Sequence, residues 1–272
     1  MQTALVNGYQ MTFAELGAGV PLVLVHGSTC DLRAWTEQMD AFAARYRTFA
    51  LSLRACWPDR WESAESRYSV AQHIRDVATF IAYRGAGPVH LLGLSRGGYI
   101  AFRIAREYPH LVRTLVLAEP GGAIDPALEA ELPAGPPPIA VGPLFAAAVE
   151  RIERNAADEG LGLMFDALGG AGYWGGLSDA TRQMLRDNAR TLIPQLAEQR
   201  IPYARTDAAR IRVPTLLLGG ERSPAGFHRT LDALQAALPS AARGVVPAAS
   251  HLSNIDNPAA FNAAVLAFLE GR

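Results

Sequence analysis

Lysine is missing from this sequence: all 25 of its basic residues, in a chain of 272, are arginines. Without lysine, the protein has no amine that forms a Schiff base with a carbonyl substrate and no P-loop lysine to bind phosphate. This absence excludes pyridoxal-phosphate enzymes, aldolases that act through a Schiff base, and ordinary P-loop nucleotide hydrolases.

Cysteines and long hydrophobic runs are scarce. The two cysteines, Cys30 and Cys56, are too few for a disulfide framework or a metal cluster, and neither has the spacing of a catalytic thiol. No apolar stretch reaches the roughly 18–20 residues that a membrane span requires. The N-terminal residues lack the charged and apolar regions of an export signal. We therefore expect a cytoplasmic protein that does not enter a membrane.

The charges of the sequence nearly cancel. The formal net charge is −1 and the isoelectric point is about 6.6, which gives no basic surface for nucleic acid. Half of the residues are hydrophobic and 19% are charged, so the chain can bury a large core. We expect no nucleic-acid partner, and the sequence leaves the oligomeric state open, with a homodimer as one option.

Strand-like and helix-like segments alternate along the first part of the chain. Asn7-Gly8 separates two strand-like segments, a pattern typical of a hairpin. Continuous apolar runs further on indicate strands that are buried on both faces, and segments with helical periodicity lie between them. The segments are 3–6, 10–16, 21–26, 35–46, 48–53, 70–83, 89–94, 99–108 and 114–118.

The alternation stops over residues 122–210, which are mostly helical in pattern at 145–157, 161–168 and 180–199. It then resumes with strands at 213–218 and 244–246 and helices at 224–238 and 258–269. We predict an α/β fold with a mostly parallel eight-stranded sheet and helices on both faces. Residues 1–121 and 211–272 would form its core. Residues 122–210 would form a helical cap inserted between strands six and seven.

The strongest motif is Gly93-Leu94-Ser95-Arg96-Gly97, which an apolar strand enters and a helix leaves. A serine on so sharp a turn adopts a strained backbone, and the flanking glycines remove side-chain clashes. The turn raises the hydroxyl above the sheet at a helix N-terminus, where backbone N–H groups favour an anion. The motif predicts that Ser95 is a nucleophile.

A serine nucleophile needs an adjacent base, and six histidines are present. His251 follows the last predicted strand at its C-terminal end, the edge where open α/β sheets build their sites. Its place after the nucleophile in chain order also suits a hydrolase of this topology. We predict His251 as the base and regard His228 as a weak candidate.

The run His26-Gly27-Ser28 ends the first long buried strand. The backbone N–H of Ser28 would point into the site beside that of Arg96, and two such donors stabilise the oxyanion of acyl transfer. The Arg96 side chain then needs no catalytic role, and we expect it to be packed or paired rather than to bind substrate.

Together these residues resemble the α/β-hydrolase superfamily over nearly the whole chain. His26-Gly27 resembles its oxyanion loop, the 93–97 motif its nucleophile elbow, and His251 its catalytic histidine. The 122–210 insertion lies where that superfamily carries its lids. A serine nucleophile resembles the esterase and lactonase branches, whereas haloalkane dehalogenases and epoxide hydrolases of this fold use Asp there.

The sequence departs from the superfamily at the acid of the triad. The usual acid follows the first strand after the insertion, where this chain has Ser223, which supplies no negative charge. Glu119 is our first candidate. It ends the strand that follows the nucleophile helix, and sequential strands are often neighbours. Glu119-Pro120 also resembles the place of the acid in zearalenone-type lactonases. Glu221 and the lack of any acid are the alternatives. We expect the loop around Ser223 to have lost the geometry that reaches the histidine.

A glycine-rich stretch at 170–175 matches the G-x-G-x-x-G pattern of dinucleotide sites. That pattern requires a preceding strand, and here the preceding residues look helical, so we expect no nucleotide. We predict instead that Tyr173 and Trp174 face an apolar substrate pocket, with Phe145 and Phe165 as further candidates. Packing of the Tyr173 and Trp174 rings in the core is the alternative.

These residues predict hydrolysis of a carboxylic ester or lactone through an acyl-enzyme, without cofactor or metal ion. Ser95 would attack the carbonyl, His251 would take the proton, and Glu119 would orient His251. The expected partner is a small ester or lactone with an apolar part. The alternatives are C–C bond hydrolysis or cofactor-free oxygenation on the same scaffold, and a non-catalytic ligand receptor.

Overall fold

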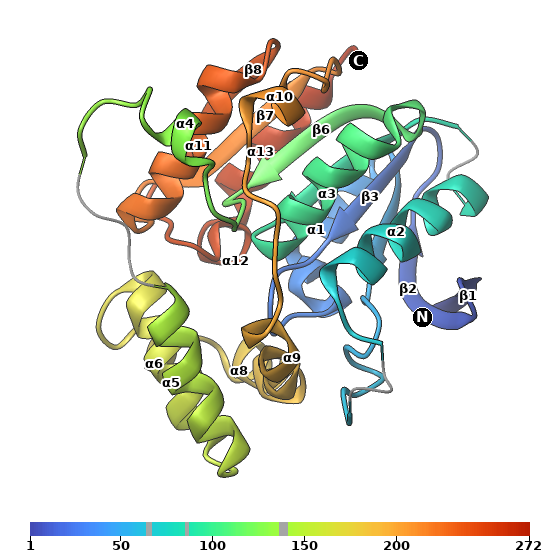
Figure 1. Cartoon of the computed structure of the whole chain (residues 1–272). Coiled ribbons are helices and arrows are strands. Elements are labelled where there is room, and N and C mark those ends of the chain that lie inside the picture. The colour runs from blue at the N-terminus through green and yellow to red at the C-terminus, as the bar shows by residue number, and fades with distance from the viewer. Residues whose placement is uncertain (64–66, 85–86, 136–140) are drawn as a thin grey trace.

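The computed structural model describes residues 1–63, 67–84, 87–135 and 141–272. Its centre is an eight-stranded sheet with the strand order β1-β2-β4-β3-β5-β6-β7-β8, shown in Figure 1. The predicted eight-stranded, mostly parallel sheet is confirmed. The strands are β1 (Gln2–Val6), β2 (Tyr9–Leu16), β3 (Pro21–Val25), β4 (Arg47–Leu51), β5 (Val89–Leu94), β6 (Val112–Ala118), β7 (Thr215–Gly220) and β8 (Ala241–Val246).

The antiparallel part of the sheet lies at one edge. β1 and β2 form the predicted hairpin, and β2 is antiparallel to β4. Asn7 and Gly8 form its two-residue turn with φ values of 46° and 75°, a conformation that Asn-Gly adopts more easily than most pairs. From β4 to β8 all neighbouring strands are parallel, so their carboxyl ends meet at one edge.

The buried strands carry apolar side chains on both faces. In β3, Val23 and Val25 belong to the core on one face, and Leu22 and Leu24 to the core on the other. This follows from the two-residue period of a strand and explains the uninterrupted apolar run. Helices α2 (Val70–Arg84), α3 (Arg96–Glu107) and α11 (Ala225–Ala237) pack on the first face, and α1 (Thr36–Ala43) and α13 (Pro258–Leu269) on the second.

Seven helices in the described residues lie between β6 and β7. In Figure 1, α5, α6, α8 and α9 form a group below the sheet, whereas α4 and α10 lie near α11 and β7. A bridge between Ile124 and Tyr203 brings the two ends of this stretch together. The helices are α4 (Pro126–Glu129), α5 (Val141–Glu153), α6 (Ala157–Gly169), α7 (Tyr173–Gly176), α8 (Asp179–Asp187), α9 (Leu192–Leu196) and α10 (Arg205–Ala208).

The helix predicted over 180–199 is wrong as one element: it is divided into α8 and α9 by a 3-10 turn at Ala189–Thr191. Asn188 causes the division, because its amide donates both to Met184 O and to the buried carboxylate of Asp31. In the part of the chain that the structure describes, no helix is both long and apolar enough to cross a membrane.

Candidate active site

Ser95 lies on the turn between β5 and α3, as the motif predicts. Its backbone has φ 53° and ψ −116°, a region that non-glycine residues rarely occupy. Glycine is required on both sides, because a Cβ on Gly93 would lie 2.1 Å from Gly97 O and one on Gly97 would lie 2.1 Å from Val25 O. The turn is fixed by hydrogen bonds from Ser95 N to Ala118 O and from Gly121 N to Ser95 O.

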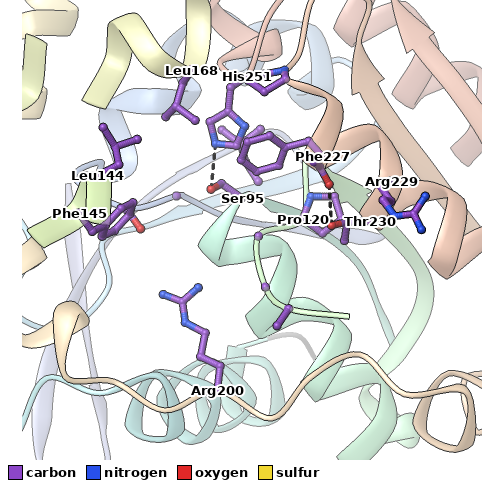
Figure 2. Close-up of a pocket in the computed structure, with 18 of the residues that line it drawn as sticks. Ser95, Pro120, Leu144, Phe145, Leu168, Arg200, Phe227, Arg229, Thr230 and His251 are labelled. Atoms are coloured by element: carbon purple, nitrogen blue, oxygen red, sulfur yellow. Dashed lines mark hydrogen bonds between the residues drawn. The ribbon is translucent and has the colours of Figure 1, made fainter. Parts of the chain in front are cut away.

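The hydroxyl of Ser95 is hydrogen-bonded to His251. The distance from Ser95 Oγ to His251 Nε2 is 3.0 Å, within the range of a base that accepts a proton, and Figure 2 shows the contact as a dashed line. His251 follows β8 and is 5% exposed. The ring of Phe227 from α11 lies against the imidazole with a centroid separation of 4.1 Å.

Glu119 follows β6 and carries the second contact of His251. Its Oε2 lies 3.3 Å from His251 Nδ1, and the carboxylate is fully buried. Glu221, the alternative acid, is exposed and accepts instead from the backbone N–H of Ala248 at 2.8 Å. The structure thus brings Ser95, His251 and Glu119 together and leaves Glu221 outside the group.

Ser223 takes part in the same group. Its hydroxyl donates to Glu119 Oε1 at 2.8 Å, and the backbone N–H of Gly220 donates to the same oxygen. The loop around Ser223 therefore lies against Glu119, the residue that contacts the histidine. Glu119 Oε2 contacts His251, and the Ser223 hydroxyl provides a hydrogen-bond donor for the other oxygen, Oε1. This bond holds the loop against Glu119.

The two predicted oxyanion residues lie near the nucleophile, and the side chain of each is hydrogen-bonded to a residue between β6 and β7. Gly27 lies so near that a Cβ there would be 3.2 Å from Ser95 Cβ, and Ser28 follows it in the cavity wall. The Ser28 hydroxyl donates to Gln195 Oε1 at 2.6 Å. The buried Arg96 guanidinium forms a two-nitrogen ion pair with Glu198.

His26 is a structural residue beside this loop. Its Nε2 accepts from Leu53 N at 3.0 Å, and its Nδ1 therefore carries the proton that it donates to Gly27 O at 2.8 Å. Burial lowers the pKa of His26 to about 4, so the ring is neutral. The ring thus links the residues that follow β3 and β4, and its bond to Gly27 O holds the backbone at Gly27 in position.

A cavity of about 700 Å³ opens over Ser95 and His251. Its walls are mostly apolar, and Figure 2 shows Leu144, Phe145 and Leu168 on one side and Phe227 on the other. The remaining lining residues are Gly27, Ser28, Cys30, Leu94, Ser95, Pro120, Gly121, Gly122, Ala123, Ile124, Pro126, Glu129, Met164, Phe165, Arg200, Pro224, Gly226, Arg229, Thr230, His251 and Leu252.

Of the four aromatic residues that we predicted to face the pocket, two line the cavity and two do not. Phe145 and Phe165 line the cavity, but Tyr173 and Trp174 do not. The Tyr173 hydroxyl donates to Asp256 at 2.6 Å, and the Trp174 ring stacks on the ring of Phe165. Both rings are held by packing and hydrogen bonding, which matches the core-packing alternative.

Phe227 and Arg200 are among the cavity residues that sequence reasoning missed. Phe227 lies in the segment predicted as a helix at 224–238, and Arg200 lies in an irregular segment that has no motif. Cys30 also lines the cavity, but burial raises the pKa of its thiol well above the ordinary value, so it is not a thiolate. No cluster of three or more potential metal ligands occurs among the described residues.

Curated relatives match only part of this chain. It is 28% identical over 116 residues to a soluble epoxide hydrolase of Corynebacterium sp. (strain C12), covering 43% of this chain and 40% of the relative. It is 34% identical over 125 residues to the dihydrolipoyllysine-residue acetyltransferase component of the acetoin cleaving system of Pseudomonas putida, covering 44% and 33%. The matches therefore span less than half the length of these relatives.

Similarity to solved structures extends over almost the whole chain. Carboxylesterase CesB from Bacillus subtilis superposes with a TM-score of 0.80 at 19% identity, covering 99% of this chain and 91% of that one. The enol-lactonase from Burkholderia xenovorans LB400 gives 0.74 at 20% identity, covering 98% and 99%. These likenesses show the fold. The sequence itself matches the family described as "Alpha/beta hydrolase family" over residues 22–264, and the chain therefore belongs to the alpha/beta hydrolase family.

Proposed function

We propose that this protein is a serine hydrolase that cleaves a carboxylic ester or lactone through an acyl-enzyme, in the esterase and lactonase branch of its family. One observation carries the proposal: a continuous hydrogen-bonded path from Ser95 Oγ through the His251 ring to the buried carboxylate of Glu119. The Ser95 end of the path lies in the wall of an apolar cavity, where a carbonyl carbon would have access to the hydroxyl.

The chemistry proceeds in two half-reactions. Ser95 Oγ attacks the carbonyl carbon while His251 Nε2 accepts its proton, and Glu119 stabilises the imidazolium that forms. The oxyanion accepts hydrogen bonds from the backbone N–H groups of Ser28 and Arg96. His251 then gives its proton to the departing alcohol oxygen. Water, activated by the same histidine, attacks the acyl-enzyme and releases the carboxylic acid and free Ser95.

The cavity supports a substrate with an apolar part. Leu144, Phe145 and Leu168 form one side of it, and such walls favour hydrocarbon over a sugar or a phosphate ester. Two neighbours in fold are described as a carboxylesterase and an enol-lactonase, which agrees with acyl transfer as the reaction class.

The test is labelling of the protein with a fluorophosphonate probe, which reacts with an activated serine, together with hydrolysis of p-nitrophenyl esters of increasing chain length. We expect labelling and turnover in the native protein and neither in Ser95→Ala, whose melting temperature should remain within a few degrees. Residual acceleration of roughly 10³-fold over water can survive from the oxyanion donors alone.

The alternatives give different results in the same experiment. A receptor on this fold would bind ligands in the cavity but would leave the probe unreacted. C–C bond hydrolysis or cofactor-free oxygenation would show little ester turnover, and the oxygenase would consume oxygen with an aromatic substrate. Full turnover in Ser95→Ala would remove the nucleophile assignment altogether.

A further inference from the structure

Arg200 brings a charged group to the wall of the otherwise apolar cavity. It lies in the irregular segment between α9 and α10, and 22% of its side chain is exposed. Figure 2 shows the guanidinium extending from this segment toward the cavity, on the side opposite His251. A cation at this place is costly to desolvate, so its presence calls for a physical explanation.

The Arg200 side chain is held in a defined orientation. Its Nε donates to Glu198 Oε2 at 3.1 Å, and its guanidinium carbon lies 5.7 Å from the ring centre of Tyr99. Its two terminal nitrogens have no hydrogen-bond partner among the residues that the structure describes. A guanidinium fixed through Nε presents these two nitrogens as a planar fork, the geometry that binds both oxygens of a carboxylate.

The charges around Arg200 do not cancel. Glu198 is shared between Arg96, which it binds through both oxygens, and Arg200. His73, which contacts Arg96, is neutral because burial and the charge of Arg96 hold its pKa well below the ordinary value. Two guanidinium groups therefore face one carboxylate, which leaves one positive charge. Burial, together with the charge of Arg96, accordingly lowers the pKa of Arg200.

The other arginine of the cavity provides a contrast. Arg229 forms an ion pair with Glu129 through Nε and donates to Pro133 O at 2.9 Å. Its charge is matched by its own carboxylate, and both members of the pair line the cavity. The unmatched charge beside the cavity is therefore that of the Arg200 cluster, which consists of Arg200, Arg96 and Glu198.

We propose that Arg200 is the binding site for a carboxylate on the substrate, so that the substrate is an ester or lactone with an apolar part and one free carboxylate. This inference deepens the proposed hydrolase function and rests on it. A monoanion fits better than a phosphate dianion, because the cluster has a single unmatched charge. The carboxylate belongs either to the acyl part or to the alcohol part, and the two arms of the experiment distinguish these.

The first arm compares p-nitrophenyl hexanoate with mono-p-nitrophenyl adipate, which have acyl chains of the same number of carbons. The second arm compares phenyl hexanoate with 4-carboxyphenyl hexanoate. In one arm the native protein should have a kcat/KM for the carboxylated ester about tenfold or more above that for the neutral ester, the size of a charge-assisted hydrogen bond. No preference in either arm would overturn the anion site without any variant.

Variants locate the preference. Arg200→Met should lower the ratio of carboxylated to neutral kcat/KM to about one, and Arg200→Lys should keep part of it. The matched control is the double variant Glu129→Gln, Arg229→Met, which removes a paired cation from the same cavity and should keep the native ratio. A ratio lost in the double variant but kept in Arg200→Met would assign the carboxylate to Arg229 and overturn the proposal.

A binding measurement separates the two proposals. In Ser95→Ala, the monoanilide of adipic acid should bind more tightly than hexananilide by calorimetry, and this difference should be lost in Ser95→Ala, Arg200→Met. If the native protein cleaves no ester but this difference is present, the hydrolase proposal fails and the anion site stands. If esters are cleaved and neither the kinetic nor the binding difference is found, the anion site fails and the hydrolase stands.

Discussion

The carboxylate that contacts His251 follows β6, the strand next to the one from which the family resemblance predicts the acid. β6 and β7 are parallel neighbours in a register that pairs Ala118 with Leu218. The residue after Ala118 therefore lies beside the start of the loop that leads to Ser223. Glu119, with a longer side chain than Asp, reaches the imidazole from this place, and its positive φ of 49° turns the chain away from the strand.

Glu119→Gln should lower kcat by about three to four orders of magnitude. Loss of the orienting acid costs about 10⁴ in serine proteases, because the imidazolium loses its counter-charge and the ring loses its tautomer. Glu221→Gln should change kcat less than twofold, since that carboxylate bonds to Ala248 and lies outside the group. Turnover of a p-nitrophenyl ester measures both, with melting temperatures as the control for folding. The reverse pair of results would assign the acid to Glu221.

Ser223 provides a test of whether the two acid positions are interchangeable. Its hydroxyl lies 2.8 Å from Glu119 Oε1, so a carboxylate introduced at 223 would lie beside the position of the charge that contacts the histidine. The double variant Glu119→Gln, Ser223→Asp should recover at least tenfold in kcat over Glu119→Gln. Ser223→Asp alone should lower kcat, because two adjacent carboxylates repel and one takes up a proton. Equal activity of the double variant and Glu119→Gln would show that position 223 does not serve His251.

At the scale of elements, one short segment of the insertion contacts both of the residues that we predict to stabilise the oxyanion, Ser28 and Arg96. Gln195 in α9 accepts from the Ser28 hydroxyl, and Glu198 just beyond it pairs with Arg96. Glu198 also accepts from the backbone N–H of Val70, the first residue of α2. The end of α9 thus fixes the loop after β3 and the start of α3 relative to each other.

Glu198→Gln should destabilise the protein by about 3–5 kcal/mol, the cost of leaving a buried charge without its partner. Burial alone would raise the pKa of Glu198, but the hydrogen bonds and charges of Arg96 and Arg200 outweigh it, so the pKa is lowered. Glu198 is therefore ionised in the folded protein. Urea unfolding measures the loss, and Glu153→Gln on the exposed face of α5 is the matched control. Equal stability of the two variants would contradict the role given to this segment.

The sequence predicted those elements whose signals are local. The elbow was predictable because glycines at 93 and 97 are a steric requirement of the turn, and Glu119 because consecutive strands are neighbours. The break between α8 and α9 was not, since it depends on a contact between Asn188 and Asp31, far apart in the chain. The positions of the Tyr173 and Trp174 rings, which lie outside the cavity lining, were not predictable either, because a glycine-rich stretch does not reveal which way its rings pack. The role proposed for Arg200 was not predictable either, because its unmatched charge arises only from its position beside Arg96 and Glu198.

At the scale of the whole molecule, three buried histidines make stability depend on pH. Burial lowers the pKa values of His26 and His90 to about 4, and burial together with the charge of Arg96 holds the pKa of His73 well below its ordinary value. In the unfolded chain these rings have a pKa near 6.5. Above about pH 7 both states are unprotonated, and the histidines have no effect on the balance. As the pH falls from 6.5 toward 4, the unfolded chain binds protons that the folded protein does not, so stability is lost with acidification.

The free energy of unfolding should therefore fall steeply between pH 6.5 and 4.5, by up to about 1.4 kcal/mol per pH unit for each of these histidines. Denaturant titrations at pH 7.5, 6 and 5 measure it, above the range where most carboxylates protonate. His90→Asn keeps a polar group beside Thr114, to which His90 Nδ1 lies at 2.8 Å, and should reduce the slope by about one histidine. A free energy that stays constant down to pH 5 would mean that the buried rings take up protons as easily as those of the unfolded chain.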